Sequence, residues 1–277
     1  MIELPESNTL VKQINKNLVG KTVKSVIATQ SPHKFAWYHG DPNEYPARLN
    51  GDSMTSAEAH GMFVQINLKK STLLFSDGIN LRLHPAAGPI PSKHQLLVQF
   101  DDGTALSASV QMYGGLFCFD KSVKFDNPYY QIAISKPSPL TNSFDQAYFK
   151  EILAPETIQK LSLKAALATE QRIPGLGNGV LQDILWYARL NPRRKVNTLS
   201  GEELDSLFAN LKQTLSDMTR LGGRDTEKDL FGQFGGYQTV MSAKSAGKPC
   251  PVCGSNIVKE AYLGGSIYYC PSCQKVS

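Results

Sequence analysis

Alternating apolar and polar residues mark the first half of the chain. The run Met62–Leu68 alternates as a half-buried strand does, and further short apolar runs follow it. These predicted strands span residues 71–75, 95–100, 104–110 and 115–119. Asp-Gly and Gly-Gly turns bound them, which is typical of hairpins because glycine adopts left-handed conformations without strain. With an opening helix at Glu6–Leu18, residues 1–136 are predicted to form an antiparallel β-sandwich with flanking helices.

The second half of the chain is predicted to be helical. Two prolines in the segment 137–142 indicate a linker, and residues 143–242 are assigned to a helical domain. Ser200 is a candidate N-cap, and Glu203 completes a capping box. The apolar residues that follow at helical spacing are Leu204, Leu207, Leu211, Leu215 and Met218. Another helix, predicted over Val180–Leu190, ends at the Asn-Pro pair that follows it.

The tail, residues 243–277, carries the most specific pattern, two Cys-x-x-Cys pairs separated by sixteen residues. Four thiolates at this spacing match the template of a structural zinc site, in which a tetrahedral ion keeps no open coordination position. The candidate ligands are Cys250, Cys253, Cys270 and Cys273. Two disulfides or a thioredoxin-like redox motif are the alternatives, but a redox site needs one such motif beside a βαβ unit. The tail is therefore predicted to be a β-hairpin around one Zn²⁺.

Composition and charge narrow the class of protein only modestly. Hydrophobic residues make up 41% and charged residues 19% of the chain, and no apolar run is long enough to suggest a membrane span. The N-terminus lacks the basic and apolar regions of a signal peptide. The net charge is +5, and its clustering at Arg189, Arg193, Arg194 and Lys195 fits a polyanion partner or a solvated face equally well. Cys118, in an apolar run, indicates a buried thiol in a reducing cytosol.

A glycine turn ahead of the predicted helix at 180–190 is a candidate binding site. Gly175 and Gly177 stand one residue apart, and their missing side chains let backbone N–H groups approach a phosphate. The helix N-terminus adds partial positive charge, and Asn178 can donate its amide to the same phosphate or cap the helix. Most such turns only pack one helix against another, so the motif alone is weak evidence for a phosphate site. The zinc tail and the β-rich first half of the chain strengthen that interpretation.

Together these motifs resemble the Fpg/Nei family of DNA glycosylases over nearly the whole chain. The resemblance rests on Glu3-Leu-Pro-Glu6, Asn80-Leu-Arg-Leu83, Ile173-Pro-Gly-Leu-Gly-Asn178 and the two Cys-Pro-x-Cys segments. It implies an α+β multidomain fold in which damaged double-stranded DNA binds between the β-sandwich and a helix–two-turn–helix domain, followed by a zinc finger. It also implies a monomer that acts in the cytoplasm in association with the nucleoid.

The N-terminus departs from the family's pattern. Active members attack the sugar with their N-terminal amine, usually that of a proline at position 2, but Ile2 stands there. We expect Met1 to remain, because its removal generally needs a small second residue; if Met1 were removed, Ile2 would offer a primary amine. The family's hairpin lysine falls at Met62 and its zinc-finger arginine at Gly265. Without a Schiff base there is no elimination, so AP-lyase activity is expected to be weak or absent.

The resemblance also assigns roles to two glutamates. Glu3 is implied to act as an acid or base near the glycosidic bond, and Glu6 to orient the N-terminal region. Two carboxylates at this bond could instead activate water, as in a monofunctional glycosylase. The competing interpretation is that both acidic residues only cap the opening helix.

Further DNA contacts follow from the same resemblance. Leu83, Met112 and Tyr113 are implied to fill the gap left by an everted base, although each could be an ordinary core residue of a hairpin. Lys164 is implied to contact a phosphate, whereas a lone lysine on a helix is usually solvated.

Three functions are compatible with these features. The first is a base-excision repair glycosylase that hydrolyses the N-glycosidic bond of a flipped damaged base. The second is a catalytically silent module that recognises damaged, abasic or distorted DNA. The third, an RNA-binding zinc protein, would need a platform of exposed aromatic residues, which the sequence does not indicate. The retained Glu3 and Glu6 favour the enzyme, which is the predicted function.

Overall fold

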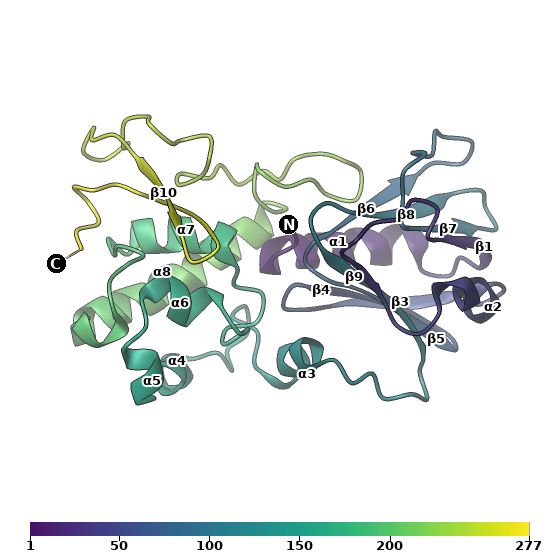
Figure 1. The fold of residues 1–277 in the computed structure, drawn as a ribbon, viewed down its shortest axis with the longest axis horizontal. Coiled ribbons are helices and arrows are strands. Elements are labelled where there is room, and N and C mark those ends of the chain that lie inside the picture. The colour runs from purple at the N-terminus through teal and green to yellow at the C-terminus, as the bar shows by residue number, and fades with distance from the viewer. Residues whose placement is uncertain (277) are drawn as a thin grey trace.

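The computed structural model describes residues 1–276, and the first part of the chain forms two β-sheets (Figure 1). One sheet has the order β1-β7-β8-β6, from β1 (Val23–Ala28), β6 (Ile79–His84), β7 (Leu96–Phe100) and β8 (Ala105–Val110). The other has the order β2-β9-β5-β4-β3, from β2 (Ala36–Tyr38), β3 (Met54–His60), β4 (Phe63–Leu68), β5 (Ser71–Phe75) and β9 (Gly114–Asp120). Neighbouring strands are antiparallel except β2 and β9, which pair in parallel.

Both sheets share one hydrophobic core with helix α1 (Leu4–Leu18). Val98 from one sheet, Ile66 from the other and Ile14 from α1 belong to the same buried cluster. Helices η1 (Pro42–Glu44) and α2 (Tyr45–Leu49) flank this sandwich. The predicted antiparallel β-sandwich with flanking helices is therefore confirmed.

Two elements of the sandwich differ from the prediction. Helix α1 begins at Leu4 rather than Glu6, because the Glu6 carboxylate accepts the Glu3 N–H at 3.1 Å and so satisfies the helix start. Strand β4 is buried on both faces instead of one. A separate, mostly aromatic cluster covers the face of the sheet that points away from the main core, and helix α3 (Pro128–Ser135) contributes Tyr130 to it.

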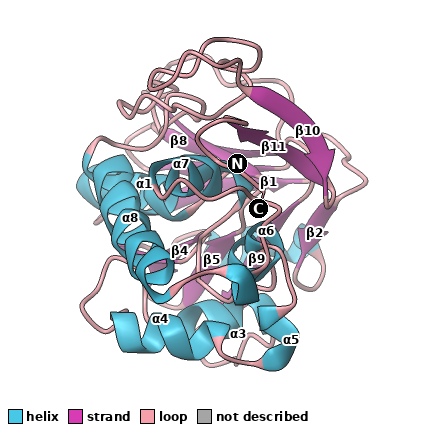
Figure 2. Ribbon diagram, turned by 90° about the vertical axis from the view of Figure 1, so that its left-hand side faces the viewer, coloured by secondary structure: helices cyan, strands magenta, loops and turns pink. Residues whose placement is uncertain are grey.

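Helices occupy the second part of the chain, as predicted. They are α4 (Gln146–Leu153), α5 (Glu156–Gln159), α6 (Leu163–Ala168), α7 (Asn178–Tyr187), η2 (Val196–Thr198) and α8 (Gly201–Arg220). The predicted capping box starts α8: Ser200 Oγ accepts the Glu203 N–H at 3.2 Å, and the Glu203 carboxylate accepts the Ser200 N–H at 2.9 Å. Helices α1, α7 and α8 gather on one side of the molecule (Figure 2).

Helix α7 lies within a second buried cluster that it shares with α8. It was predicted over 180–190 but ends at Tyr187, and Arg189 then adopts a left-handed φ of 59°, which a continuing helix does not permit. The predicted linker 137–142 lies between α3 and α4. The domain boundaries themselves stay a prediction.

The segment between α8 and the C-terminal hairpin has no helix or strand, and part of it extends toward β6 (Figure 1). Leu230 in this segment is fully buried in the core of the sandwich. Its N–H donates to Gln13 Oε1 at 3.0 Å, and its carbonyl accepts the Leu83 N–H at 2.9 Å. The hairpin pairs β10 (Val258–Tyr262) with β11 (Gly265–Tyr269). In the part of the chain described, no helix is long and apolar enough to cross a membrane.

Candidate functional site

A cleft of about 640 Å³ lies where the sandwich, the helical part and the C-terminal hairpin meet. The N-terminus, the β5–β6 and β8–β9 turns, the start of α7 and the β10–β11 turn all contribute to its walls. The cleft lining from these segments includes Glu3, Trp37, Asp77, Met112, Tyr113, Lys164, Asn178 and Gly265. The fold therefore brings most of the residues that the sequence singled out into one place.

The Glu3 carboxylate lies at the N-terminus of α7. Its Oε1 accepts the Gly179 N–H and its Oε2 accepts the Val180 N–H, each at 2.8 Å. Only 3% of Glu3 is exposed. A carboxylate in this position satisfies two free N–H groups and interacts favourably with the helix dipole. Glu3 thus caps, through its side chain, a helix that is far away in the sequence.

The glycine turn makes its close contacts within the protein. A Cβ at Gly177 would lie 2.6 Å from the Glu3 carboxyl carbon, so a side chain there would displace the carboxylate. Gly175 has a φ of +79°, and a Cβ there would lie 2.8 Å from a backbone atom of Gly61. The Gly175 carbonyl also accepts the Leu4 N–H at 2.9 Å. The turn therefore joins the helical part to the N-terminus, and its predicted phosphate contact stays a prediction.

Arg224 is buried between the two N-terminal glutamates. Its guanidinium donates to Glu6 at 2.9 and 2.8 Å and lies 3.6 Å from the Glu3 carboxylate. A Cβ at position 179 would lie 1.7 Å from the guanidinium, so Gly179 leaves room for this cation. Burial raises the pKa of Glu3, and the Arg224 charge opposes that rise only in part. Burial also favours neutral Glu6, but the charge and hydrogen bonds of Arg224 hold its pKa below the usual range.

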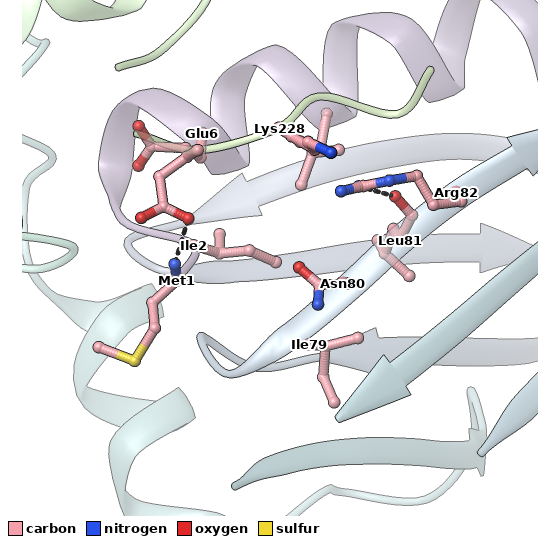
Figure 3. A pocket seen from close by; sticks show the side chains of 10 residues that line it. Met1, Ile2, Glu6, Ile79, Asn80, Leu81, Arg82 and Lys228 are labelled. Carbon is pink, nitrogen blue, oxygen red and sulfur yellow. Dashed lines mark hydrogen bonds and ion pairs between the residues drawn. The ribbon is translucent and has the colours of Figure 1, made fainter. Parts of the chain in front are cut away.

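The N-terminal nitrogen atoms have separate partners. The Met1 ammonium forms an ion pair with the Glu227 carboxylate, shown by a dashed line in the close-up of the small pocket beside the cleft (Figure 3). The Ile2 N–H donates to the Asp77 carbonyl at 2.7 Å, and 4% of Ile2 is exposed. With Met1 in place, the Ile2 nitrogen is an amide, and the N-terminal primary amine belongs to Met1.

The three predicted gap-filling residues separate into two locations. Leu83 packs against the core of the sandwich, its N–H donates to the Leu230 carbonyl, and it does not line the cleft. Met112 is 61% exposed and lies on the cleft wall beside Tyr113. Tyr113 packs against Trp37, with ring centroids 5.8 Å apart. Only Met112 and Tyr113 are therefore placed to face a bound molecule in this cleft.

The residues predicted to contact phosphate hold the C-terminal hairpin in the structure. Asn178 Nδ2 donates to the Ser266 carbonyl at 2.9 Å, and the Lys164 ammonium donates to the Tyr262 carbonyl. Lys164 is 4% exposed, so the alternative of a solvated lysine is wrong. A Cβ at Gly265 would lie 3.3 Å from Lys164 Nζ and 3.7 Å from Asn178 Nδ2. Both polar groups thus converge on a position that has no side chain.

The four cysteines of the tail form one cluster. Their sulfur atoms, in Cys250, Cys253, Cys270 and Cys273, all lie within 4.8 Å of one another. Two of the separations are 3.3 and 3.9 Å, and the longer one is close to the roughly 3.8 Å between sulfurs that each lie about 2.3 Å from a tetrahedral Zn²⁺. All are free thiols, which excludes the two disulfides. The donor set fits the structural zinc ion predicted from the sequence.

Buried hydrogen bonds join the cysteine cluster to the helical part. Gln274 is fully buried; its Oε1 accepts the Cys270 N–H and its Nε2 donates to the Leu190 carbonyl, each at 2.9 Å. Asn191, also fully buried, donates through Nδ2 to the Gln274 carbonyl at 2.9 Å. The metal ligands are therefore positioned by the segment that follows α7.

Two cations of the predicted basic cluster are paired within the protein. Arg193 donates to Glu260 at 3.0 and 2.8 Å and lies 4.3 Å above the Tyr262 ring. Arg194 pairs with Glu203 at the start of α8. Two of the four cations therefore have structural roles: Arg193 holds the hairpin, and Arg194 supports the start of α8. The clustering of charge in the sequence did not indicate these roles.

Sequence reasoning missed three residues of the site. Arg224 follows a Gly-Gly pair in a loop that has no recognisable motif, and its pairing with Glu3 and Glu6 depends on the fold. Asp77 was considered only as part of a turn, but its carboxyl lines the cleft, where burial raises its pKa. Trp37 lies in a strand too short to be predicted. None of these positions has a local signal that would have found it.

Comparisons with known proteins agree with this geometry. Models of the formamidopyrimidine-DNA glycosylase N-terminal domain and H2TH domain match residues 1–111 and 136–229. A formamidopyrimidine-DNA glycosylase of Lactobacillus delbrueckii is 27% identical over 99% of this chain and 100% of its own length. One from Bacillus cereus is 26% identical over 99% of both chains.

Solved structures show the same fold. The Lactococcus lactis Fpg protein in complex with DNA containing an abasic site matches with a TM-score of 0.81 and 22% identity over 99% of both chains. The MutM (Fpg) protein of Thermus thermophilus matches with a TM-score of 0.81 and 24% identity over the same share. With two family models covering both major parts of the chain and relatives aligned over their full length, the chain belongs to the formamidopyrimidine-DNA glycosylase family.

Proposed function

We propose that this protein is a base-excision repair DNA glycosylase that binds damaged double-stranded DNA and hydrolyses the N-glycosidic bond of a flipped damaged base. The observation that carries the proposal is the position of Glu3, a buried carboxyl that lines a cleft large enough for a nucleotide. Family membership supports the reaction class. The silent binding module is less favoured, because the relatives aligned over the full chain are named as glycosylases.

The chemistry that we propose uses two carboxyl groups of the cleft. Departure of a base leaves positive charge on the sugar, which a nearby carboxylate stabilises. Burial raises the pKa of Glu3, and a raised pKa makes a carboxyl better able to take up a proton and pass it to the leaving base. Asp77 supplies the second carboxyl on the cleft wall and is the candidate base for an attacking water. Glu6 faces Arg224 instead, so we assign it to positioning.

We expect AP-lyase activity to be weak. A Schiff base needs an unprotonated amine at the sugar, and the Met1 amine is paired as an ammonium with Glu227. The Ile2 nitrogen would serve only after removal of Met1 and after release from the Asp77 carbonyl. Hydrolysis by water, with the sugar left as an abasic site, is therefore the proposed outcome.

The DNA contacts that we propose lie along the rim of the cleft. Asn178 and Lys164 can direct their donors to a phosphate once DNA competes with the carbonyls of the hairpin. Zn²⁺, when bound, stabilises this hairpin and takes no part in the reaction. A monomer is sufficient, because every group of the site comes from one chain. We place the protein in the cytoplasm, at the nucleoid, since its substrate is chromosomal DNA.

A base-release assay tests this function. Duplexes that carry single oxidised purines or oxidised pyrimidines would be incubated with excess protein, and free bases would be identified by mass spectrometry. We expect release from at least one oxidised duplex and none from the undamaged duplex of the same sequence. Tight binding to damaged DNA without any free base would favour the silent binding module instead.

A further inference from the structure

An exposed aromatic pair stands on the wall of the cleft. Trp37 lies on β2, in register with Gly115 of β9, and 49% of it is exposed. Its ring packs against Tyr113 with an interplanar angle of 32° and a centroid separation of 5.8 Å. Met112 and Tyr129, which are 61% and 57% exposed, line the same cleft. So much exposed apolar surface around a concave site marks a binding surface rather than a core.

The Tyr113 side of this pair is held in place before any ligand binds. A Cβ at Gly78 would lie 1.5 Å from the Tyr113 carbonyl oxygen, so the backbone can approach only because residue 78 is glycine. The Tyr113 hydroxyl interacts with the Asp77 carboxyl, and the Trp37 ring packs against it. A ring fixed by its neighbours loses little conformational freedom when a ligand stacks on it.

The charges of the cleft do not suit a ligand bound mainly through phosphates. Among the lining residues of the part of the chain that is described, Lys164 is the one lysine or arginine, while Glu3, Asp77 and Glu170 are acidic. Electrostatic attraction to a DNA backbone grows with the number of cations that meet phosphates. Affinity inside this cleft must therefore come chiefly from apolar and stacking contacts.

We infer that Trp37 extends the predicted gap-filling surface of Tyr113 into a stacking site for an unpaired nucleobase of duplex DNA. Aromatic faces stack on any base, and this pair opens into the cleft whose rim carries the Asn178 amide for the adjoining phosphate. The inference rests on the proposed function, since it takes DNA to be the substrate. It adds Trp37, on a strand distant in sequence from the Met112–Tyr113 turn, as a residue that selects DNA with an unpaired base.

Binding measurements on matched variants test this site. Fluorescence anisotropy would compare a fully paired duplex with one that carries a stable abasic analogue and so leaves one base unpaired. Trp37→Ala should weaken binding to the second duplex by about 5- to 140-fold, the equivalent of ~1–3 kcal/mol per stacked base, and to the first by less than about twofold. Trp37→Phe should retain most of the preference. Equal losses on both duplexes, or none, would overturn the inference.

Phe35 provides the matched control. It lies two positions away and is 46% exposed, yet it does not line the cleft. Phe35→Ala should leave the preference for the abasic-analogue duplex within about twofold of the wild type, because it removes a comparable exposed ring that no base contacts. A loss as large as that of Trp37→Ala would indicate a general effect of the loop and would overturn the assignment of Trp37.

Tryptophan emission gives a second, independent readout. The chain contains two tryptophans, and Trp186 is 7% exposed beneath the zinc hairpin, so quenching by a stacked base reports on Trp37. We expect quenching by the abasic-analogue duplex in the wild type and its loss in Trp37→Phe; equal quenching in both would contradict the site. Both assays measure binding, so a protein that releases no base could still show the stacking site. If the protein releases the damaged base but Trp37→Ala binds both duplexes as the wild type does, the stacking site is refuted while the proposed glycosylase function stands.

Discussion

The carboxylate of Glu3 accepts the backbone N–H of Val180 at 2.8 Å, across 177 positions of the chain. This bond links the first residues of the sandwich to the first turn of α7, where Gly179 donates to the same carboxylate. The group proposed to act on the glycosidic bond is therefore also the cap of the helix at the cleft. Its catalytic and structural roles predict different effects that can be measured separately.

Glu3→Gln should reduce stability as well as activity. A glutamine keeps the shape of the side chain, but only its amide oxygen can accept, so one of the two N–H groups loses its acceptor. Arg224 also loses the negative charge of Glu3, which lies 3.6 Å away. We expect the free energy of unfolding to fall by about 1–3 kcal/mol, measured by urea denaturation. The control Glu156→Gln changes an exposed glutamate and should cost less than about 0.5 kcal/mol. Equal stability of the two variants would argue against the cap.

Gly265→Arg should strengthen DNA binding. The position faces Lys164 and Asn178, and a Cβ there would meet the flexible end of the lysine at 3.3 Å and the Asn178 amide nitrogen at 3.7 Å, which is ordinary contact. One added charge-assisted contact to a phosphate is worth about 1.5–3 kcal/mol, or roughly 10- to 140-fold in affinity. The slope of log K against log salt should steepen by about 0.9. The control Gly201→Arg adds the same charge at the open start of α8, and a gain as large there would contradict the contact.

Asp183 predicts a specific pH dependence of stability. Burial raises its pKa to about 6, although its carboxylate accepts the N–H groups of Val240 and Met241. The folded protein thus binds this proton more tightly than an unfolded chain, in which aspartate titrates near ~3.9. The stabilising contribution is complete below that value and is lost as the pH rises through about 6.

The test compares the wild type with Asp183→Asn, which cannot titrate. The difference in unfolding free energy, wild type minus variant, should fall by on the order of 1 kcal/mol between roughly pH 5 and 7.5. Urea denaturation at several pH values would measure it, and groups that titrate in both proteins cancel in the difference. A difference independent of pH would show that Asp183 keeps an ordinary pKa.

Removal of zinc should release the C-terminal hairpin from α7. Without the metal, the four thiolates repel or protonate, and the bonds from Asn178 and Lys164 to the hairpin lose their partners. We expect a chelator to expose residues 243–276 to limited proteolysis and to weaken DNA binding. Cys250→Ser should abolish the single equivalent of zinc, whereas Cys118→Ala, a buried thiol of the sandwich, should retain it. Full zinc content in Cys250→Ser would exclude the cluster.

Local patterns explain how much of this fold the sequence predicts. The Ser200–Glu203 capping box and the paired cysteines each specify their structure within a few residues or by fixed spacing, and both are confirmed. The alternation in Met62–Leu68 identified a strand but not its second buried face, because aromatic residues from distant segments cover it. Structure that neighbouring residues determine can be predicted from the sequence, whereas burial by distant segments cannot.

The site divides in the same way. Glu3 and Asn178 could be selected because their motifs are contiguous, yet their partners Val180 and Ser266 come from other elements. Leu83 was expected at the cleft but packs against the core of the sandwich, where its N–H donates to the Leu230 carbonyl of the loop after α8. Such a loop contact has no periodicity or spacing from which it could be predicted.

The most direct test of the account is single-turnover base release by the wild type and Glu3→Gln on the same oxidised duplex, with borohydride present in a parallel reaction. We expect the wild type to release the free base and to leave the strand intact until alkali is added, with little covalent adduct at Met1. We expect no release by Glu3→Gln under conditions in which the variant is folded. Release at equal rates by both proteins, or binding without release by the wild type, would contradict it.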